Sequence, residues 1–321
     1  MTGSYLAWRL LQLLPATAGI VVIGFLLIHI APGDPVLALA GEHGDAAYYE
    51  FMRHRFGLDR PIPERLATYA ARVAQGDFGM SYIHGRPALE VILERAPATL
   101  LLTGTALLLS VLVGVPLGAL AALRHRRSAD ALITVTALGL YSAPVFWVGQ
   151  LAVLLFASHL GLFPVQGIAT AGSSAAGLHH ALDVARHLTV PALVLASQEI
   201  AALVRLTRGG LITELATDHV RTARANGLSE RVVVFRHALP RALLPVLTVI
   251  GARAGHLIAG AVVVEIVFGW PGLGRLLISS LQTRDAPVLL GLFFLVSITV
   301  ILANLLTDLL YAAVDPRIRY R

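Results

Sequence analysis

The stretch HVRTARANGLSERVVVFRHALP, residues 219–240, lies between two long apolar runs and holds four arginines. Its first eight residues can form a short helix. Gly227 can close that helix, because a glycine adopts the left-handed conformation at little steric cost. Ser229 then suits the residue that precedes a second helix, and Leu239-Pro240 marks the end of the stretch. The stretch therefore predicts two short helices joined by a bend, which form a rigid elbow outside the apolar runs.

The composition around this elbow is that of a membrane protein. Hydrophobic residues make up 56% of the 321 residues and charged residues only 14%, which is too apolar for an ordinary soluble surface. All 25 residues of the Lys+Arg count are arginine, so a Schiff-base lysine and a phosphate-binding loop ending in Gly-Lys-Ser/Thr are both excluded. The absence of cysteine excludes disulfides, a thiol nucleophile and cysteine metal clusters. If ATP powers this protein, another chain must bind it.

Six stretches are long and apolar enough to cross a bilayer, since a spanning helix needs about 20 predominantly apolar residues. They cover residues about 8–30, 97–123, 131–158, 188–208, 242–265 and 286–311. The fourth is the weakest, because Gln198 and Glu199 lie inside it. The predicted fold class is an all-α polytopic membrane protein with six transmembrane helices, and the first span is predicted to be retained rather than cleaved as a signal peptide.

Arginine placement predicts the orientation of these spans. The segment RHRR at 124–127, the stretch 205–241 with seven arginines against three acids, and the tail RIRYR all fall on one side of a six-span arrangement. By the positive-inside rule that side is cytoplasmic, so both termini are expected there. Residues 31–95 carry seven arginines against nine acids and are expected outside.

Three parts follow from this arrangement. Residues 1–30 form an N-terminal segment with the first span, residues 31–96 a small extracytoplasmic cap, and residues 97–321 a core with spans two to six. Inside the core, the cytoplasmic loop 209–241 contains the elbow. Within the cap, a helix is expected near 63–75.

Six blocks, in order along the chain, resemble the inner-membrane permeases of ABC importers. Within these binding-protein-dependent transport systems, they resemble the B-type permease subunits of the dipeptide/oligopeptide branch. They are IAPGDP, FGLDRPIPERLATYAARVAQGDFGMSY, VPLGALAAL, HVRTARANGLSERVVVFRHAL, VVVEIVFGWPGLGRLL and DLLYAAVDPRIRY. The elbow resembles the family's EAA loop: the last alanine, the glycine four positions later and Leu-Pro match. Arg221 stands in place of the family's Glu, and His237 in place of its Ile.

The resemblance implies a type I ABC importer permease fold, in which this loop is a coupling helix seated in a groove of the cytoplasmic ATPase. The residues it assigns to ATPase coupling are Arg221, Thr222, Ala223, Arg224, Gly227, Leu228, Ser229, Leu239 and Pro240. The alternative is that the arginines bind anionic lipid headgroups, which is worth about 1 kcal/mol for each arginine near the surface.

The implied partners are a second homologous permease, cytoplasmic ABC ATPase subunits that hold ATP and Mg²⁺, an extracytoplasmic solute-binding protein and the bilayer of the bacterial inner membrane. No cofactor is expected on this chain, and no nucleic acid is expected as a partner.

Three charged or titratable side chains, Glu199, Arg253 and His256, fall within predicted spans, where a central charge costs at least about 2.5–3.5 kcal/mol. They are expected to line a substrate pathway or to form a structural pair such as Glu199 with Arg253. Glu265, beside FGWPGLG, is expected in an outer gate or in a helix-end hydrogen bond. No recognised catalytic motif and no credible set of metal ligands is found.

These features together predict the transmembrane subunit of an ATP-driven importer of short peptides that works by alternating access. One alternative is a secondary transporter in which Glu199, Arg253 and His256 carry protons, although that class would show internal repeats or broken midplane helices. The other alternative is a polytopic membrane enzyme, which needs a reactive group of residues that the sequence does not show.

Overall fold

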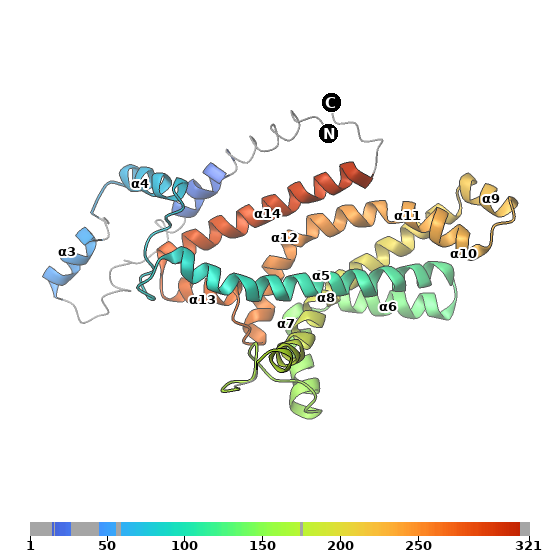
Figure 1. Ribbon diagram of the computed structural model, residues 1–321, viewed down its shortest axis with the longest axis horizontal. Coiled ribbons are helices and arrows are strands. Elements are labelled where there is room, and N and C mark those ends of the chain that lie inside the picture. Colours follow the sequence, from blue (N-terminus) through green and yellow to red (C-terminus); the bar gives the residue numbers. More distant parts are fainter. Residues whose placement is uncertain (1–14, 16, 27–44, 56–58, 174–175, 315–321) are drawn as a thin grey trace. The chain divides into compact units, whose positions relative to one another are not determined.

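The fold is described from a computed structural model of the 321-residue chain. The structure describes residue 15 and residues 17–26, 45–55, 59–173 and 176–314 (Figure 1). Side chains at 55, 247–248, 251–259, 304 and 306–314 lie outside this description. The chain forms two compact units: one within residues 1–97 and 272–302, the other within 98–271 and 303–319.

Helices account for nearly all regular structure in the described residues, as expected for an all-α protein. The elements of Figure 1 are α3 (Ala46–Arg55), α4 (Ile62–Ala74), α5 (Ala88–Leu123), α6 (Ser128–Ser142), α7 (Val145–Ala152), the π-helix η2 (Val153–His159), α8 (Leu178–Leu215), α9 (Asp218–Ala225), α10 (Glu230–Val232), the π-helix η3 (Val233–Ala238), α11 (Leu239–Ala242), α12 (Leu244–Val267), α13 (Leu273–Gln282) and α14 (Ala286–Val314). A further apolar helix covers Thr17–Leu26.

Three helices of the described residues are long and apolar enough to cross a membrane: α5, α8 and the part Ala286–Ala303 of α14. A fourth would be the bent pair formed by α6 with α7 and η2. The predicted fifth span coincides with most of α12, a helix of 24 residues. The structure is thus a helical protein with several apolar spans, and the number six stays a prediction.

The predicted span 131–158 is not one straight helix. It is bent by 104° between α6 and the segment Val145–His159. The cause is Pro144, whose ring disfavours helical backbone at the residue before it. Ala143 accordingly takes the extended angles φ −76° and ψ 133°. The residues on both sides of this proline are apolar, so hydropathy alone predicts one continuous span and does not reveal the bend.

Two helices are longer than their predicted spans. α5 begins at Ala88 rather than at residue 97, and α8 covers Leu178–Leu215 rather than 188–208. At about 1.5 Å per residue, 38 residues extend about 57 Å, nearly twice the thickness of a hydrocarbon core of about 30 Å. Part of α8 must therefore stand outside any bilayer that it crosses.

The first unit has an apolar cluster on which one face of the amphipathic helix α4 packs, and α4 matches the helix predicted near 63–75. Val73 is buried in an apolar cluster with Phe78 and Ile92, and the ring of Tyr69 stacks on Phe25 at 5.9 Å. The cluster also contains Val288 of α14. These contacts join the helices of this unit around one core.

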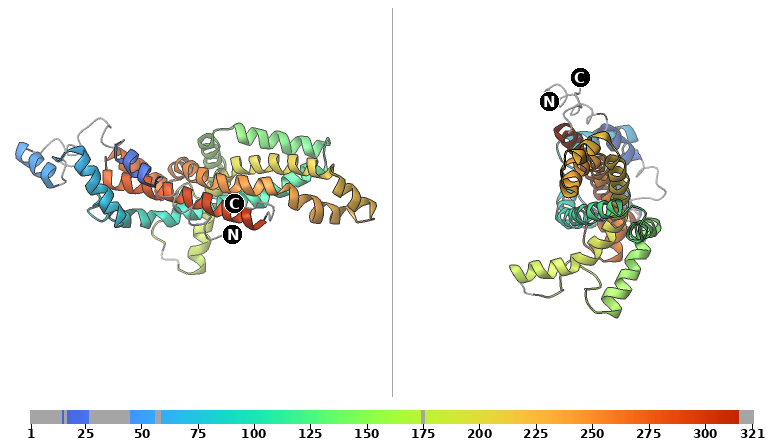
Figure 2. Two further views of the ribbon diagram at one scale, coloured as in Figure 1. Left: turned by 90° about the horizontal axis from the view of Figure 1, so that it is seen from above. Right: turned by 90° about the vertical axis from the view of Figure 1, so that its right-hand side faces the viewer.

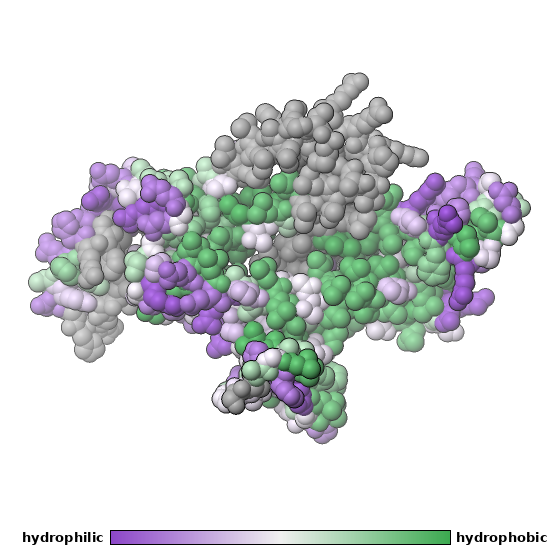
Figure 3. All heavy atoms as spheres, viewed as in Figure 1, coloured by the Kyte–Doolittle hydropathy of each residue, from purple (hydrophilic) through white to green (hydrophobic). Residues whose placement is uncertain are grey.

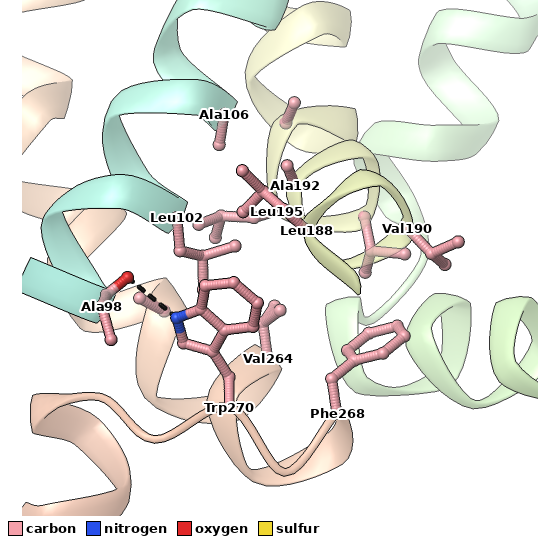
Figure 4. Packing of buried hydrophobic residues seen from close by; sticks show 13 residues of the cluster. Ala98, Leu102, Ala106, Leu188, Val190, Ala192, Leu195, Val264, Phe268 and Trp270 are labelled. Carbon is pink, nitrogen blue, oxygen red and sulfur yellow. Dashed lines mark hydrogen bonds between the residues drawn. The ribbon is translucent and has the colours of Figure 1, made fainter. Parts of the chain in front are cut away.

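The second unit has its core between α5, α8 and the end of α12. Trp270 is fully buried, and its Nε1–H donates to the carbonyl of Ala98 at 2.8 Å (Figure 4). Leu102 and Leu195 belong to the same cluster. Large buried side chains and one satisfied indole N–H thus fix this end of the unit.

Candidate functional site

The elbow begins where α8 ends, and Figures 1 and 2 show α9 beyond the ends of α5 and α6. Val220 and Ala223 are buried on one face of α9, a short helix where the sequence predicted one. They pack against Ala119 of α5 and Leu211 of α8. Apolar contacts with two long helices therefore hold α9 in one orientation.

Gly227 closes α9 with a φ angle of +77°, in the left-handed region. Its N–H donates to the Arg224 carbonyl at 2.9 Å, and the Leu228 N–H donates to the Ala223 carbonyl at 3.3 Å. These two bonds make the Schellman end of a helix. A Cβ at Gly227 would meet no described atom within 4 Å, so backbone conformation alone demands glycine.

The second arm of the elbow runs from Ser229 to the end of α11. Ser229 precedes α10 with extended angles, and its carbonyl accepts the N–H of Val233 at 3.0 Å. Within the described chain its side chain makes no capping hydrogen bond. Pro240 has no N–H for the carbonyl of Arg236, and the wider π-helical turn η3 lies just before it.

Arg224 joins the two arms across the glycine turn. Its Nη2 donates to Glu230 Oε1 at 2.7 Å, and its Nε donates to Oε2 at 3.1 Å. A bidentate pair of this kind fixes orientation as well as distance. The Arg224 guanidinium lowers the pKa of the Glu230 carboxyl through these hydrogen bonds. Arg221 instead pairs with Asp218 at 3.2 Å and is 71% exposed.

The outer surface of the elbow is polar, and Figure 3 shows hydrophilic residues gathered over it. The residues assigned to coupling divide between this surface and the core beneath it. Ala223 is buried and Leu239 half-buried, whereas the exposed members are Arg221, Thr222, Arg224, Gly227, Leu228, Ser229 and Pro240. The structure thus places all nine on one segment.

The residues predicted for the substrate pathway lie on two helices. Glu199 is half-buried on α8, and Arg253 and His256 belong to α12, with side chains outside the description. Glu265, in the last turn of α12, is fully buried and accepts the hydroxyl of Thr99 at 2.6 Å. In the described part of the chain, no group of three or more His, Cys, Asp or Glu side chains is placed to hold a metal ion.

One polar cluster was missed by the sequence reasoning. Asp130, at the start of α6, is only 4% exposed and accepts hydrogen bonds from the Arg208 guanidinium, with 2.8 Å between Nη2 and Oδ2. The signal available in the sequence was an acid in the first helical turn after RHRR, at a position where neighbouring apolar residues predicted burial.

This arrangement is that of a helical membrane protein with an elbow beyond its long helices. Among solved structures, a chain of the inward-facing MetNI methionine ABC transporter shares the fold, with a TM-score of 0.57 and 17% identity over 71% of this chain and 97% of that one. The chain belongs to the binding-protein-dependent transport system inner membrane components. That family's model matches residues 114–320, and the model of the N-terminal part of such components matches residues 4–103.

Curated relatives cover almost the whole chain. The glutathione transport system permease protein GsiC of Escherichia coli K12 is 39% identical over 318 residues, which are 99% of each chain. The protein of the same name from Shigella flexneri serotype 5b is 38% identical over the same length.

The chain is therefore an ABC transporter permease subunit, a multi-pass inner-membrane protein and not itself an enzyme. Permeases of ABC importers work with ATPase subunits, which bind the ATP, and with a binding protein. This assignment replaces both alternatives raised by the sequence, the proton-coupled transporter and the membrane enzyme.

Proposed function

We propose that this chain moves short peptides into the cytoplasm by alternating access, and that the elbow formed by α9, the Gly227 turn and α10 receives the motion of a partner ATPase. The observation that carries the proposal is an exposed polar segment that is held in place by several contacts and is separated by two residues from α8, the longest helix of the described residues. A stiff segment of this kind transmits a push, whereas a flexible loop would absorb it.

Three independent contacts provide this stiffness. Val220 and Ala223 anchor α9 in an apolar cluster, the glycine turn carries two backbone hydrogen bonds, and Arg224 holds Glu230 across the turn. The exposed Leu228, at 40% exposure, lies at the tip between polar neighbours. Such a tip, with one apolar side chain in a polar surround, suits a groove on another protein.

The lipid-anchor alternative fits this surface less well. Arg224 and Arg221 are already paired with Glu230 and Asp218, so these two arginines offer anionic headgroups less net charge than the exposed Arg231 and Arg236 do. Binding of an unpaired arginine to headgroups is worth about 1 kcal/mol. This attraction depends on charge near the surface and does not require the ordered helix end at Gly227. Contact with a groove on another protein would depend both on the fixed shape of the elbow and on its mixture of positive and negative side chains.

The proposed assembly contains this chain, a second homologous permease, ATPase subunits that hold ATP and Mg²⁺, and an extracytoplasmic solute-binding protein. Arginine placement supports an orientation with both termini and the elbow in the cytoplasm and residues 31–96 outside. In this orientation the binding protein docks on the outer cap, and the ATPases act on the elbow.

Peptide transport is supported by the relatives named for glutathione, a tripeptide. Within the pathway we propose that Arg253 and His256 meet the carboxylate of the peptide and that Glu199 lies near its amino group. Arg253 and His256 are three residues apart and therefore share one face of α12. Glu265 is proposed to hold the outer end of that helix to α5 through Thr99.

The test is uptake by the complete complex reconstituted in vesicles, with glutathione and dialanine as probes. ATP-dependent accumulation that persists without a proton gradient supports the proposal. Accumulation of neither probe would overturn the peptide assignment. ATP turnover retained by this chain alone after rigorous purification would overturn the division of labour with the ATPase, because the chain lacks a P-loop lysine.

A further inference from the structure

The buried carboxylate of Asp130 holds α6 to α8, and Figure 1 shows these helices together. Besides Arg208, three groups surround it. The Arg126 N–H donates to Oδ2 at 3.0 Å, the Thr134 hydroxyl donates to Oδ1 at 3.3 Å, and the Nδ1 of His125 lies 3.2 Å from Oδ2. Asp130 therefore ties the turn between α5 and α6 to a residue near the cytoplasmic end predicted for α8.

A second polar contact holds the other end of α6. The Nε2 of Gln198 on α8 donates to the Ala143 carbonyl at 3.1 Å, at the bend between α6 and α7. The ten residues from Gln198 to Arg208 correspond to about 15 Å along the helix. Between these two contacts, Ala137 of α6 packs against Ala201 and Val204 of α8. Two polar contacts and an apolar seam thus set how α6 lies on α8.

An adjacent side of α8 is held by close packing with α5. A Cβ on Gly118 would lie 2.7 Å from the Val204 carbonyl oxygen, and one on Gly114 would lie 2.8 Å from the Leu203 Cβ. Only glycine permits this separation, as in small-residue contacts between membrane helices. Consequently α8 is in contact with both α5 and α6 before the chain continues into the elbow.

Arg208 lies seven residues before the end of α8 at Leu215, or about 10 Å from the start of the elbow. An apolar seam alone resists separation of two helices better than it resists sliding. A bidentate ion pair resists sliding as well, because displacement breaks both hydrogen bonds and leaves a buried charge. The pair of Asp130 and Arg208 therefore lies at the end of α8 that a displacement of the elbow would move first.

We propose that Asp130 is a positioning residue for transport: by holding Arg208 it makes α6 move with α8 when the elbow is displaced, so that the displacement reaches the bend before α7. This inference rests on the proposed function of the elbow. In this proposal the pair acts between α6 and α8 and takes no part in ATP binding. Its loss is expected to separate ATP hydrolysis from transport rather than to abolish hydrolysis.

The test uses the complete complex with Asp130→Asn in this chain. Two readouts are taken: stimulation of ATP hydrolysis by glutathione-loaded binding protein, and the distance distribution between spin labels at Leu132→Cys and Ala225→Cys. Both positions are exposed, and the chain has no other cysteine. Most of the stimulation should be lost and the distance distribution should broaden, while unstimulated hydrolysis persists. Arg208→Lys, which keeps the charge but loses the bidentate geometry, should show a smaller loss.

The matched control is Glu94→Gln, which breaks another bidentate pair, with Arg86, at an exposed position. It should leave both readouts unchanged. Unchanged stimulation and an unbroadened distribution in Asp130→Asn would overturn the inference. If that variant does not assemble, the paired change Asp130→Asn with Arg208→Gln removes both charges, and normal coupling in it would overturn the inference equally.

The two proposals fail separately. Loss of coupling in Gly227→Val together with normal coupling in Asp130→Asn would refute the role of Asp130 and leave that of the elbow. Conversely, the distance distribution could broaden in Asp130→Asn while the ATPase is found not to contact the elbow. That result would refute the proposed function of the elbow but would support the contact between α6 and α8.

Discussion

The second unit contains two sharp bends that arise in opposite ways. At Ala143-Pro144 the chain turns by 104° inside an apolar segment, and a side chain from a neighbouring helix holds the bend. At Gly227 the chain turns in an exposed polar segment, and its own backbone and one ion pair hold it. The proline bend combines the local restriction from Pro144 with a contact from another helix, whereas the glycine bend is specified by its own segment alone.

This difference bears on what each bend can do. A locally specified turn keeps its shape while its surroundings change, which suits a segment that binds one partner through a whole cycle. A bend held by another helix changes when that helix moves, which suits a part of the membrane domain that must alternate between two arrangements. We expect the glycine bend to receive the motion and the proline bend to respond to it.

The largest effect is expected from breaking the glycine bend. In Gly227→Val a β-branched side chain must adopt a left-handed conformation that costs on the order of 1–2 kcal/mol, and the chain should relax by re-aiming the elbow. Transport should fall steeply while expression changes little. Uptake and ligand-stimulated ATP hydrolysis by the complex are the measurements, with the milder Gly227→Ala and the loop variant Arg126→Ala as controls. Full coupling in Gly227→Val at normal expression would show that the elbow is not the transmitting element.

An intermediate effect is expected from breaking the proline bend. Pro144→Ala removes the steric restriction on Ala143 and restores an N–H, so the angle between α6 and α7 should become variable. Spin labels at Leu132→Cys and Leu151→Cys, which are both exposed, should report a broader distance distribution and partial loss of uptake. A distribution as narrow as that of the parent would mean that the surrounding helices, not the proline, set this bend.

A smaller effect is expected from removing the side chain that holds the proline bend. Gln198→Leu leaves the Ala143 carbonyl without the donor that Gln198 provides and should lower stability by about 1 kcal/mol. Thermal unfolding in detergent measures the loss. Thr213→Val, which removes a hydroxyl bond within the exposed side of α8, is the control. Equal melting temperatures for Gln198→Leu and the parent would argue against any hold by Gln198.

The smallest effect is expected from the ion pair that spans the glycine bend. Glu230 has a lowered pKa in the folded protein, so its contribution is present above its unfolded pKa and is lost as pH falls through the folded value. Because the pair is exposed, it should be worth only about 0.2–1 kcal/mol. Glu230→Gln should therefore change stability slightly at neutral pH and not at all in acid. A difference that grows toward low pH would contradict this assignment of the shift.

The sequence was sufficient for the features that local chemistry specifies. The short helix and its end at Gly227 follow from helix-ending rules, and the structure confirms them. The family resemblance was likewise carried by contiguous motifs. The assignment of the nine coupling residues to an ATPase stays a prediction.

Features that depend on packing between distant segments escaped the sequence. The bend at Ala143-Pro144 was read as one span, because hydropathy does not record direction. The pairing of Asp130 with Arg208, 78 residues apart, depends on how α6 lies against α8. Glu265, expected in an outer gate or in a helix-end hydrogen bond, accepts the hydroxyl of Thr99, 166 residues away in the sequence. The bend follows from Pro144, a local signal that hydropathy does not weigh, whereas for Asp130 and Glu265 the missing information was the neighbouring residue in space.

The central claim, that the elbow binds the ATPase on the cytoplasmic side, is tested most directly by cross-linking from its tip. In this cysteine-free chain, Leu228→Cys gives a single thiol at an exposed site, and Ile62→Cys gives another on α4. We expect a short thiol cross-linker to join position 228, but not position 62, to the ATPase subunit, and an impermeant thiol reagent added to intact cells to label only position 62. Labelling of position 228 from outside, or cross-linking of the ATPase to position 62 and not to 228, would contradict the account.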